Sequence, residues 1–233
     1  MATPTSRNPL THLLWTLGTG ARIYLRSVAA GMFTIKDTVG VDDARLRVMV
    51  AAGTGAAPFI SMIRSEVCRN PLADLSKWVL LHGASYAREL GYRQELLELS
   101  KSNQLKYWGT VSRASESGNW SGDVGRVESF FEPDRVPDLE HRLGLAHGGL
   151  NPLSAVILVC GLTGTIGSAL VLLLDRGFVP HAQAIRDALG VPPDVSDSMF
   201  YELYDSTPVI HIDDPSVIEP LRARMQTALA SHS

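Results

Sequence analysis

The sequence has 233 residues, and 45% of them are hydrophobic, which is enough for a packed core in one large domain or two small ones. Its 21 basic and 24 acidic residues give a net charge of −3, so no overall field would attract nucleic acid or an anionic membrane surface. Two cysteines, Cys68 and Cys160, are too few for a disulfide framework, and the first residues lack the apolar region of a signal peptide. We therefore expect a globular cytoplasmic protein whose partners include neither nucleic acid nor a membrane.

The first 44 residues have the pattern of β-structure. Residues 22–28 alternate in polarity like a half-buried strand, and residues 31–35 read as a second strand after a glycine turn. We expect residues 1–44 to form one unit of the chain and residues 45–233 to form another.

After residue 44, strand patterns and helix patterns alternate, which predicts parallel strands joined by crossover helices. Residues 151–174 carry no charge, but glycines in the middle of this stretch favour a strand, a loop and a buried helix over a membrane span. Residues 114–153 are rich in glycine, serine, proline and acidic residues and are predicted to form a long surface excursion. The elements expected are strands at 46–51, 78–82, 105–111, 155–160 and 199–204, and helices at 58–68, 92–101, 167–177, 180–189 and 214–228.

Gly53, Gly55 and Pro58 interrupt the apolar run where the first of these strands meets its helix. Glycines at such a turn let the backbone approach a pyrophosphate, and the N–H groups of the first helical turn point at the anion. The same pattern also fits an ordinary strand-to-helix loop, so this stretch alone favours neither interpretation.

A second glycine loop, from Gly161 to Gly167, also follows a strand and opens a helix, as a nucleotide-binding loop does. Its glycines could instead only let the helix pack close to the sheet. A simple Rossmann dehydrogenase is disfavoured, because the acidic residue expected about 20 positions after such a loop has no convincing candidate: Asp187 lies in a helical pattern.

In order along the chain, these motifs resemble those of bacterial-type ferredoxin–NADP reductases, which are flavin-dependent members of the ferredoxin reductase-like superfamily. The likeness spans roughly residues 10–204. Residues 31–34 are similar to the turn that holds the FAD pyrophosphate, and residues 53–59 are similar to the loop that holds the NADP pyrophosphate. Residues 82–92, 109–113 and 125–127 are similar to the segments around the adenosine phosphate of NADP. The resemblance implies an α/β fold, in which a parallel-sheet NADP-binding domain follows a remnant of an antiparallel FAD-binding β-barrel.

The resemblance also implies which residues bind the cofactors FAD and NADP(H). Arg113 and Arg126 follow family motifs, and a guanidinium fork matches the oxygens of the NADP 2′-phosphate, although exposed arginines are more often only solvated. The cofactor-binding residues implied are Gly31, Thr34, Gly53, Thr54, Gly55, Pro58, Ser85, Tyr86, Arg113, Arg126, Gly161 and Thr163.

Three residues are implied to act at the site of hydride transfer. Cys160 would lie at the nicotinamide end of the site, but it could equally be a core cysteine. Glu202 could relay a proton, with a solvated acid as the simpler interpretation. Tyr204 could stack on the flavin ring, and Phe200 and Tyr201 compete for that role or pack in the core.

The sequence departs from the family pattern at two points. Ser85 stands where bacterial relatives often have arginine, which weakens the expected preference for NADP over NAD. Only about 44 residues precede the nucleotide domain, and no Arg-x-Tyr-Ser segment occurs, so the FAD-binding barrel is predicted to be truncated. Self-association or a partner chain could complete it.

We therefore expect an oxidoreductase that exchanges a hydride between NADPH and FAD and passes electrons to or from ferredoxin or flavodoxin. The alternative is an incomplete or non-catalytic NAD(P)-binding module that needs a partner flavoprotein. A serine hydrolase, a short-chain dehydrogenase, a zinc site and a Walker-type site all lack their motifs in this sequence. The residues after Tyr204 are expected to form an appended segment that docks on the nucleotide domain and stabilises it.

Overall fold

The computed structural model describes residues 9–25, 27–28, 31–204 and 207–231. The chain divides into two compact units, Met1–Met32 and Phe33–Ser233. Phe33 belongs to the second unit because it packs, with Ile35 and Val39, against the hydrophobic core of that unit. The assignment of residues 1–44 to a barrel remnant stays a prediction.

In the described residues, the first unit contains one helix, α1 (Pro9–Thr16), and neither of the two predicted N-terminal strands forms. The described part of residues 22–28 is exposed and has no strand pairing. Residues 31–35 lead into a turn, in which the Thr34 hydroxyl donates to Asp37 Oδ2 at 2.6 Å and the Thr38 N–H donates to the Thr34 carbonyl at 3.0 Å. A segment of alternating polarity forms a strand only where a neighbouring strand pairs with it through backbone hydrogen bonds. No such neighbouring strand occurs among the described residues before β1.

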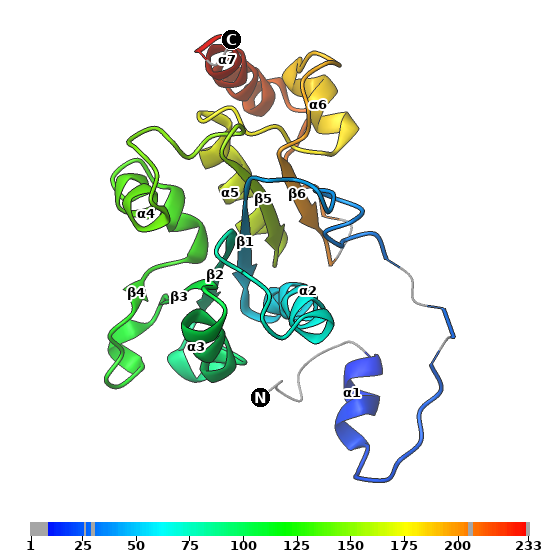
Figure 1. The fold of residues 1–233 in the computed structure, drawn as a ribbon. Helices are drawn as coiled ribbons and strands as arrows, with labels where there is room; N and C mark the ends of the chain where they lie inside the picture. Colours follow the sequence, from blue (N-terminus) through cyan, green and yellow to red (C-terminus); the bar gives the residue numbers. More distant parts are fainter. Residues whose placement is uncertain (1–8, 26, 29–30, 205–206, 232–233) are drawn as a thin grey trace. The chain divides into compact units, whose positions relative to one another are not determined.

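The second unit is built on a parallel sheet of six strands in the order β4-β3-β2-β1-β5-β6 (Figure 1). Every neighbouring pair is parallel, as the alternating sequence pattern predicted. The strands are β1 (Leu46–Ala52), β2 (Trp78–Ala84), β3 (Lys106–Val111), β4 (Asp123–Val124), β5 (Ala155–Cys160) and β6 (Met199–Glu202). The helices are α2 (Ala56–Arg69), α3 (Arg93–Ser102), α4 (Val136–Leu143), α5 (Thr163–Leu174), α6 (Gln183–Leu189) and α7 (Pro215–Ser231), with short 3-10 helices η1 (Gly53–Gly55), η2 (Ala87–Glu89), η3 (Ala114–Glu116) and η4 (Val127–Phe131).

Two hydrophobic cores lie on opposite faces of this sheet. In β1, Val48 and Val50 belong to one core and Met49 and Ala51 to the other, and all four side chains are fully buried. The first core is completed by α4, α5, α6 and α7, and the second by α2 and α3 (Figure 1). Burial on both faces explains why the strand sequences are almost continuously apolar.

The prediction that residues 114–153 form a surface excursion is wrong. This segment contains β4, η4 and α4, and it places Val127, Phe130, Phe131 and Leu139 in the first core. These apolar residues recur at helical spacing, but the surrounding glycine, proline and acidic residues obscure the pattern.

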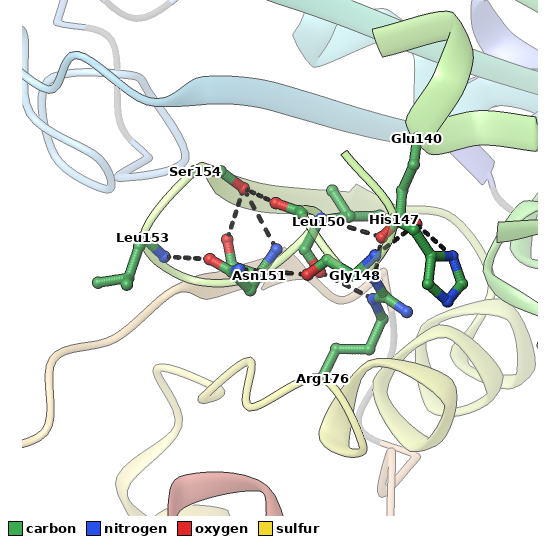
Figure 2. Close-up of polar contacts among 9 residues, drawn as sticks. Glu140, His147, Gly148, Leu150, Asn151, Leu153, Ser154 and Arg176 are labelled. Atoms are coloured by element: carbon green, nitrogen blue, oxygen red, sulfur yellow. Dashed lines mark hydrogen bonds and ion pairs between the residues drawn. The ribbon is translucent and has the colours of Figure 1, made fainter. Parts of the chain in front are cut away.

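A buried carboxylate joins this segment to α5. The Glu140 side chain is 1% exposed and forms an ion pair with Arg176, which lies just after α5 (Figure 2). The backbone N–H groups of Gly148 and Leu150 donate to the two carboxylate oxygens at 2.9 and 3.0 Å. Arg176 Nε in turn donates to the Leu150 carbonyl at 2.8 Å. Because each charge is satisfied, the network holds the loop that leads into β5 in one conformation.

The C-terminal segment docks on the nucleotide domain, as expected. Ile218, Leu221 and Met225 of α7 are buried in the first core. A β-carbon added to Gly167 of α5 would lie 2.8 Å from the Val209 carbonyl oxygen, so the chain before α7 crosses α5 closely. Residues 151–174 form β5, a loop and α5, and none of the described helices combines the length and apolar character needed to span a membrane.

Replacing Glu140 with alanine should lower the free energy of unfolding by about 3–5 kcal/mol, because Arg176 would remain with its buried partner removed. Urea denaturation of the wild-type chain and the variant measures this change. Glu98→Ala on α3 is the matched control, because Glu98 is exposed and its loss should change stability by less than about 0.5 kcal/mol. Equal stability of the two variants would show that the Glu140 network does not stabilise the fold.

Candidate dinucleotide-binding site

The helices that follow the parallel strands β1 and β5 pack on opposite faces of the sheet. The helix after β1, α2, packs on one face of the sheet, whereas α5, which follows β5, packs on the other. The two strands are neighbours, so their carboxyl ends form a topological switch point. Ligands of open parallel sheets bind in the crevice at such a point.

A cleft of about 400 Å³ lies along this edge of the sheet. It extends from the ends of β1 and β5 across β2 to β3, and we call it the carboxyl-edge cleft. Four of the predicted cofactor-binding residues line it: Gly53, Thr54, Ser85 and Arg126. The other lining residues are Ala52, Gly83, Ala84, Glu89, Ser112, Val127, Glu128, Leu162 and Thr165.

The turn after β1 has the properties of a phosphate-binding loop. Gly53 has φ +56°, in the left-handed region that favours glycine, and a β-carbon there would meet no atom within 4 Å. The 14-residue helix α2 begins immediately after this turn, at Ala56, and Pro58 lies in its first turn. Open space above Gly53 and the N–H groups of a helix N-terminus suit an anion.

Gly55 and Gly161 act in packing, because each lets the ends of β1 and β5 approach one another. A β-carbon on Gly55 would lie 2.0 Å from the Cys160 carbonyl oxygen, and one on Gly161 would lie 2.9 Å from the Ala52 β-carbon. Neither glycine lines the carboxyl-edge cleft. Gly161 therefore serves close packing, whereas Leu162 and Thr165 of the same loop line the cleft, so a role of the second loop in nucleotide binding stays a prediction.

The three residues expected at the hydride-transfer site come from neighbouring strands. The Cys160 thiol donates to the Tyr204 hydroxyl oxygen at 3.1 Å, and the Tyr204 hydroxyl donates to the Thr54 carbonyl at 3.4 Å. Burial raises the pKa of both the Cys160 thiol and the Tyr204 phenol, so both stay protonated at neutral pH. Glu202 ends β6 opposite Cys160 in the strand register. Tyr204 as a whole residue is 52% exposed, so part of its side chain is available to stack on a ligand.

Among the described residues that line the cleft, the only ion pair joins Glu128 of η4 to Arg126, the residue just before η4. Arg126 Nε lies 2.5 Å from Glu128 Oε1, and the Glu128 side chain is 8% exposed. The other carboxylate oxygen, Glu128 Oε2, has no hydrogen-bond partner among the described residues. Arg126 is therefore partly neutralised, although its side chain remains 62% exposed.

His82 in β2 is a buried polar residue beneath the cleft that sequence reasoning did not single out as a site residue. It is fully buried, and Tyr107 Oη lies 3.4 Å from its Nδ1. Burial lowers the pKa of His82 to about 4. The imidazole is therefore neutral at pH 7 and adds no positive charge beneath a phosphate. Its signal in the sequence is one polar residue in an otherwise apolar strand.

The remaining predicted residues lie outside the cleft lining. Gly31 belongs to the first unit, and Thr34 lies in the turn that begins the second. Thr163 is the first residue of α5. Tyr86 and Arg113 contact each other just beyond Ser85, where Arg113 Nη1 donates to Tyr86 Oη at 2.6 Å. Their roles in cofactor binding stay predictions.

Gly55→Ala should lower the free energy of unfolding by roughly 2 kcal/mol or more, because the new methyl group would collide with the backbone of β5. Gly164→Ala is the matched control, because a β-carbon at Gly164 in α5 meets no atom within 4 Å. It should leave stability unchanged or raise it by about 0.5–1 kcal/mol. Thermal unfolding of both variants measures the difference, and two equal melting temperatures would contradict the packing role of Gly55.

The amino-acid sequence is similar to those of known ferredoxin–NADP reductases. Among curated proteins, the chain is similar to ferredoxin–NADP reductase B of Sorangium cellulosum, with 36% identity over 129 residues that cover 55% of this chain and 47% of that protein. It is also similar to the flavodoxin/ferredoxin–NADP reductase of Escherichia coli, with 28% identity over 144 residues that cover 61% of this chain and 52% of that protein. The chain thus spans about half the length of these curated relatives.

A solved structure and a family model agree with this likeness. A ferredoxin NADP+ reductase from Neisseria gonorrhoeae with bound FAD and NADP superposes with a TM-score of 0.63 at 22% identity, covering 84% of this chain and 70% of that one. That likeness shows a shared fold. The family model of the oxidoreductase NAD-binding domain matches residues 49–169, which include both glycine loops. The chain therefore belongs to the oxidoreductase NAD-binding domain family, within the ferredoxin reductase-like superfamily.

Proposed function

We propose that this chain is a flavin-dependent oxidoreductase that exchanges a hydride between NADPH and FAD and passes electrons to or from ferredoxin or flavodoxin. The observation that carries the proposal is the carboxyl-edge cleft, which is lined by the glycine turn after β1. Thr54 of that turn accepts a hydrogen bond from Tyr204, which in turn contacts Cys160. The names of the curated relatives support the electron partners, and we propose the cytoplasm as the place of action.

The residues that line the cleft support the binding of a nicotinamide dinucleotide. Its pyrophosphate would lie over Gly53 and Thr54, where the N-terminus of α2 offers backbone N–H groups. The adenosine end would extend past Ser85 toward the ends of β2 and β3, and the nicotinamide would lie toward Cys160. In this arrangement the chain orients the nucleotide along the edge of the sheet.

The residues near Cys160 would align the reacting rings and exclude water. FAD, when bound, supplies the hydride chemistry itself. Cys160 is fully buried, and its small side chain would permit close approach of the nicotinamide once the Tyr204 ring, which would cover the flavin, moves aside. Glu202 would relay a proton between solvent and the flavin. Gly31 and Thr34 would hold the FAD pyrophosphate.

A second function is an NAD(P)-binding module that needs a partner flavoprotein or self-association to complete the flavin site. One observation favours it: among the described residues before β1, the structure contains a helix and turns but no strand. The NADP-binding half would then be present in this chain, and the flavin would be held elsewhere.

An anaerobic absorbance titration distinguishes these functions. If the proposal holds, the purified chain binds added FAD, and NADPH then bleaches the flavin band. A chain that binds NADPH but ignores FAD would support the module instead, and a chain that binds neither would refute both.

A matched pair of cysteine variants tests the proposed role of Cys160 in the same experiment. Cys160→Ser should slow the bleaching of the flavin by about tenfold or more, because the alignment of the two rings changes. Cys68→Ser should leave the rate unchanged, because Cys68 is exposed near the C-terminal end of α2, whereas Cys160 is buried in contact with Tyr204. Equal rates in the two variants would contradict the placement of Cys160 beside the nicotinamide.

A further inference from the structure

A second cavity lies where the segment before α7 passes β6 and α6. Its volume is about 710 Å³, and none of the described residues that line it also lines the carboxyl-edge cleft. Small-molecule sites in proteins commonly have volumes of this size and mostly apolar walls. The apolar lining residues include Ile185 of α6, Leu203 after β6, and Val209, Ile210 and Ile212 before α7. We call this space the C-terminal cavity.

The phenol of Tyr201 is a buried polar group in the wall of this cavity. Tyr201 is only 9% exposed and belongs to the first core, but its hydroxyl keeps access to solvent and forms no hydrogen bond within the described part of the chain. His181 contacts the Tyr201 ring edge-on, with 4.7 Å between the ring centroids, and thereby orients it. A ligand in the cavity that binds this hydroxyl would satisfy a polar group otherwise surrounded by apolar side chains.

The charged groups that line the cavity are acidic. Asp213 and Asp214 are exposed, and neither forms an ion pair with another residue in the part of the chain that the structure describes. No lysine or arginine is among the described lining residues, and the other polar one is His211, whose ring can donate or accept a hydrogen bond. Beside Tyr201, burial lowers the pKa of His181, so this imidazole adds no positive charge at neutral pH. The cavity therefore favours a cation over an anion.

The N-terminus of α7 borders the cavity, but its hydrogen-bond donors are already engaged. Pro215 has no N–H group, and the N–H groups of residues 216–218 all donate to Asp214, at 2.9 Å to its Oδ1 and at 3.0 Å to its carbonyl oxygen. The groups left open to a ligand are acceptors, namely the Asp213 carboxylate and the Tyr201 hydroxyl oxygen. A ligand of this cavity should therefore supply N–H donors.

We propose that the C-terminal cavity binds a small organic ammonium ion with an apolar body, of the arylalkylamine class. The aliphatic walls would bury the hydrocarbon part, and Asp213 and Tyr201 would accept hydrogen bonds from the ammonium group. Because the C-terminal cavity and the carboxyl-edge cleft share no lining residue, both can be occupied at once.

The test is an amide NMR titration of the isotopically labelled chain at pH 8 with phenethylamine, phenethyl alcohol and phenylacetate, which share an aromatic body and differ in charge. The amine should bind at least about tenfold more tightly than the alcohol or the acid, because only the amine forms charge-assisted hydrogen bonds with Asp213. The amides that shift should be those of residues 182–185, 201–203 and 208–214. Saturating NADP+ should leave the affinity for the amine unchanged.

Variants of the two acceptors test the assignment of the ammonium group. Asp213→Asn should weaken binding of the amine by about fivefold or more and leave binding of the alcohol unchanged. Tyr201→Phe, which removes only the hydroxyl, should weaken it by about threefold. Asp194→Asn is the matched control, because it removes the same charge from an exposed aspartate that does not line the cavity. It should leave the affinity unchanged.

Several results would overturn this inference. They are no binding of phenethylamine at millimolar concentration, equal affinity for the three probes, shifts confined to other residues, and competition with NADP+. An Asp213→Asn variant that binds the amine as tightly as Asp194→Asn would also overturn it. None of these results bears on the proposed function, which the anaerobic titration with FAD and NADPH tests separately.

Discussion

The close approach between the ends of β1 and β5 is the constraint on which the candidate site depends. Only a residue without a side chain fits at Gly55, where a β-carbon would lie 2.0 Å from the Cys160 carbonyl oxygen. That proximity brings the Thr54 carbonyl within reach of Tyr204, which also contacts the Cys160 thiol. It also sets the turn after β1 beside the loop after β5 at the switch point of the sheet. Packing between two strand ends thus places the turn that lines the cleft within reach of the Cys160–Tyr204 pair.

Charge around the cleft is organised locally, since the chain as a whole carries a net charge of −3. Beneath the turn, burial keeps His82 neutral, and Arg126 at the rim is paired with Glu128. Among the described groups, the N–H groups at the start of α2 are therefore left as a source of attraction for an anion at the turn.

Local signals made the nucleotide domain predictable from the sequence. The apolar run of β1, the glycines after it and the helical spacing of α2 are contained within about 20 residues, and the structure confirms all three. Features that depend on distant partners could not be predicted. Glu140 becomes a core residue only because Arg176 reaches it, and Arg113 meets Tyr86 only because the loops after β2 and β3 are paired at the end of the sheet. Polarity alternation in residues 22–28 was equally uninformative without a neighbouring strand.

The most direct test of the account is hydrogen–deuterium exchange of the chain with and without saturating NADP+. The account predicts slower exchange of the amides at residues 53–57, 83–86, 112–113 and 126–128, which surround the carboxyl-edge cleft, with unchanged exchange in α7. Protection confined to other parts of the chain, or no protection anywhere, would contradict the claim that this cleft binds a dinucleotide.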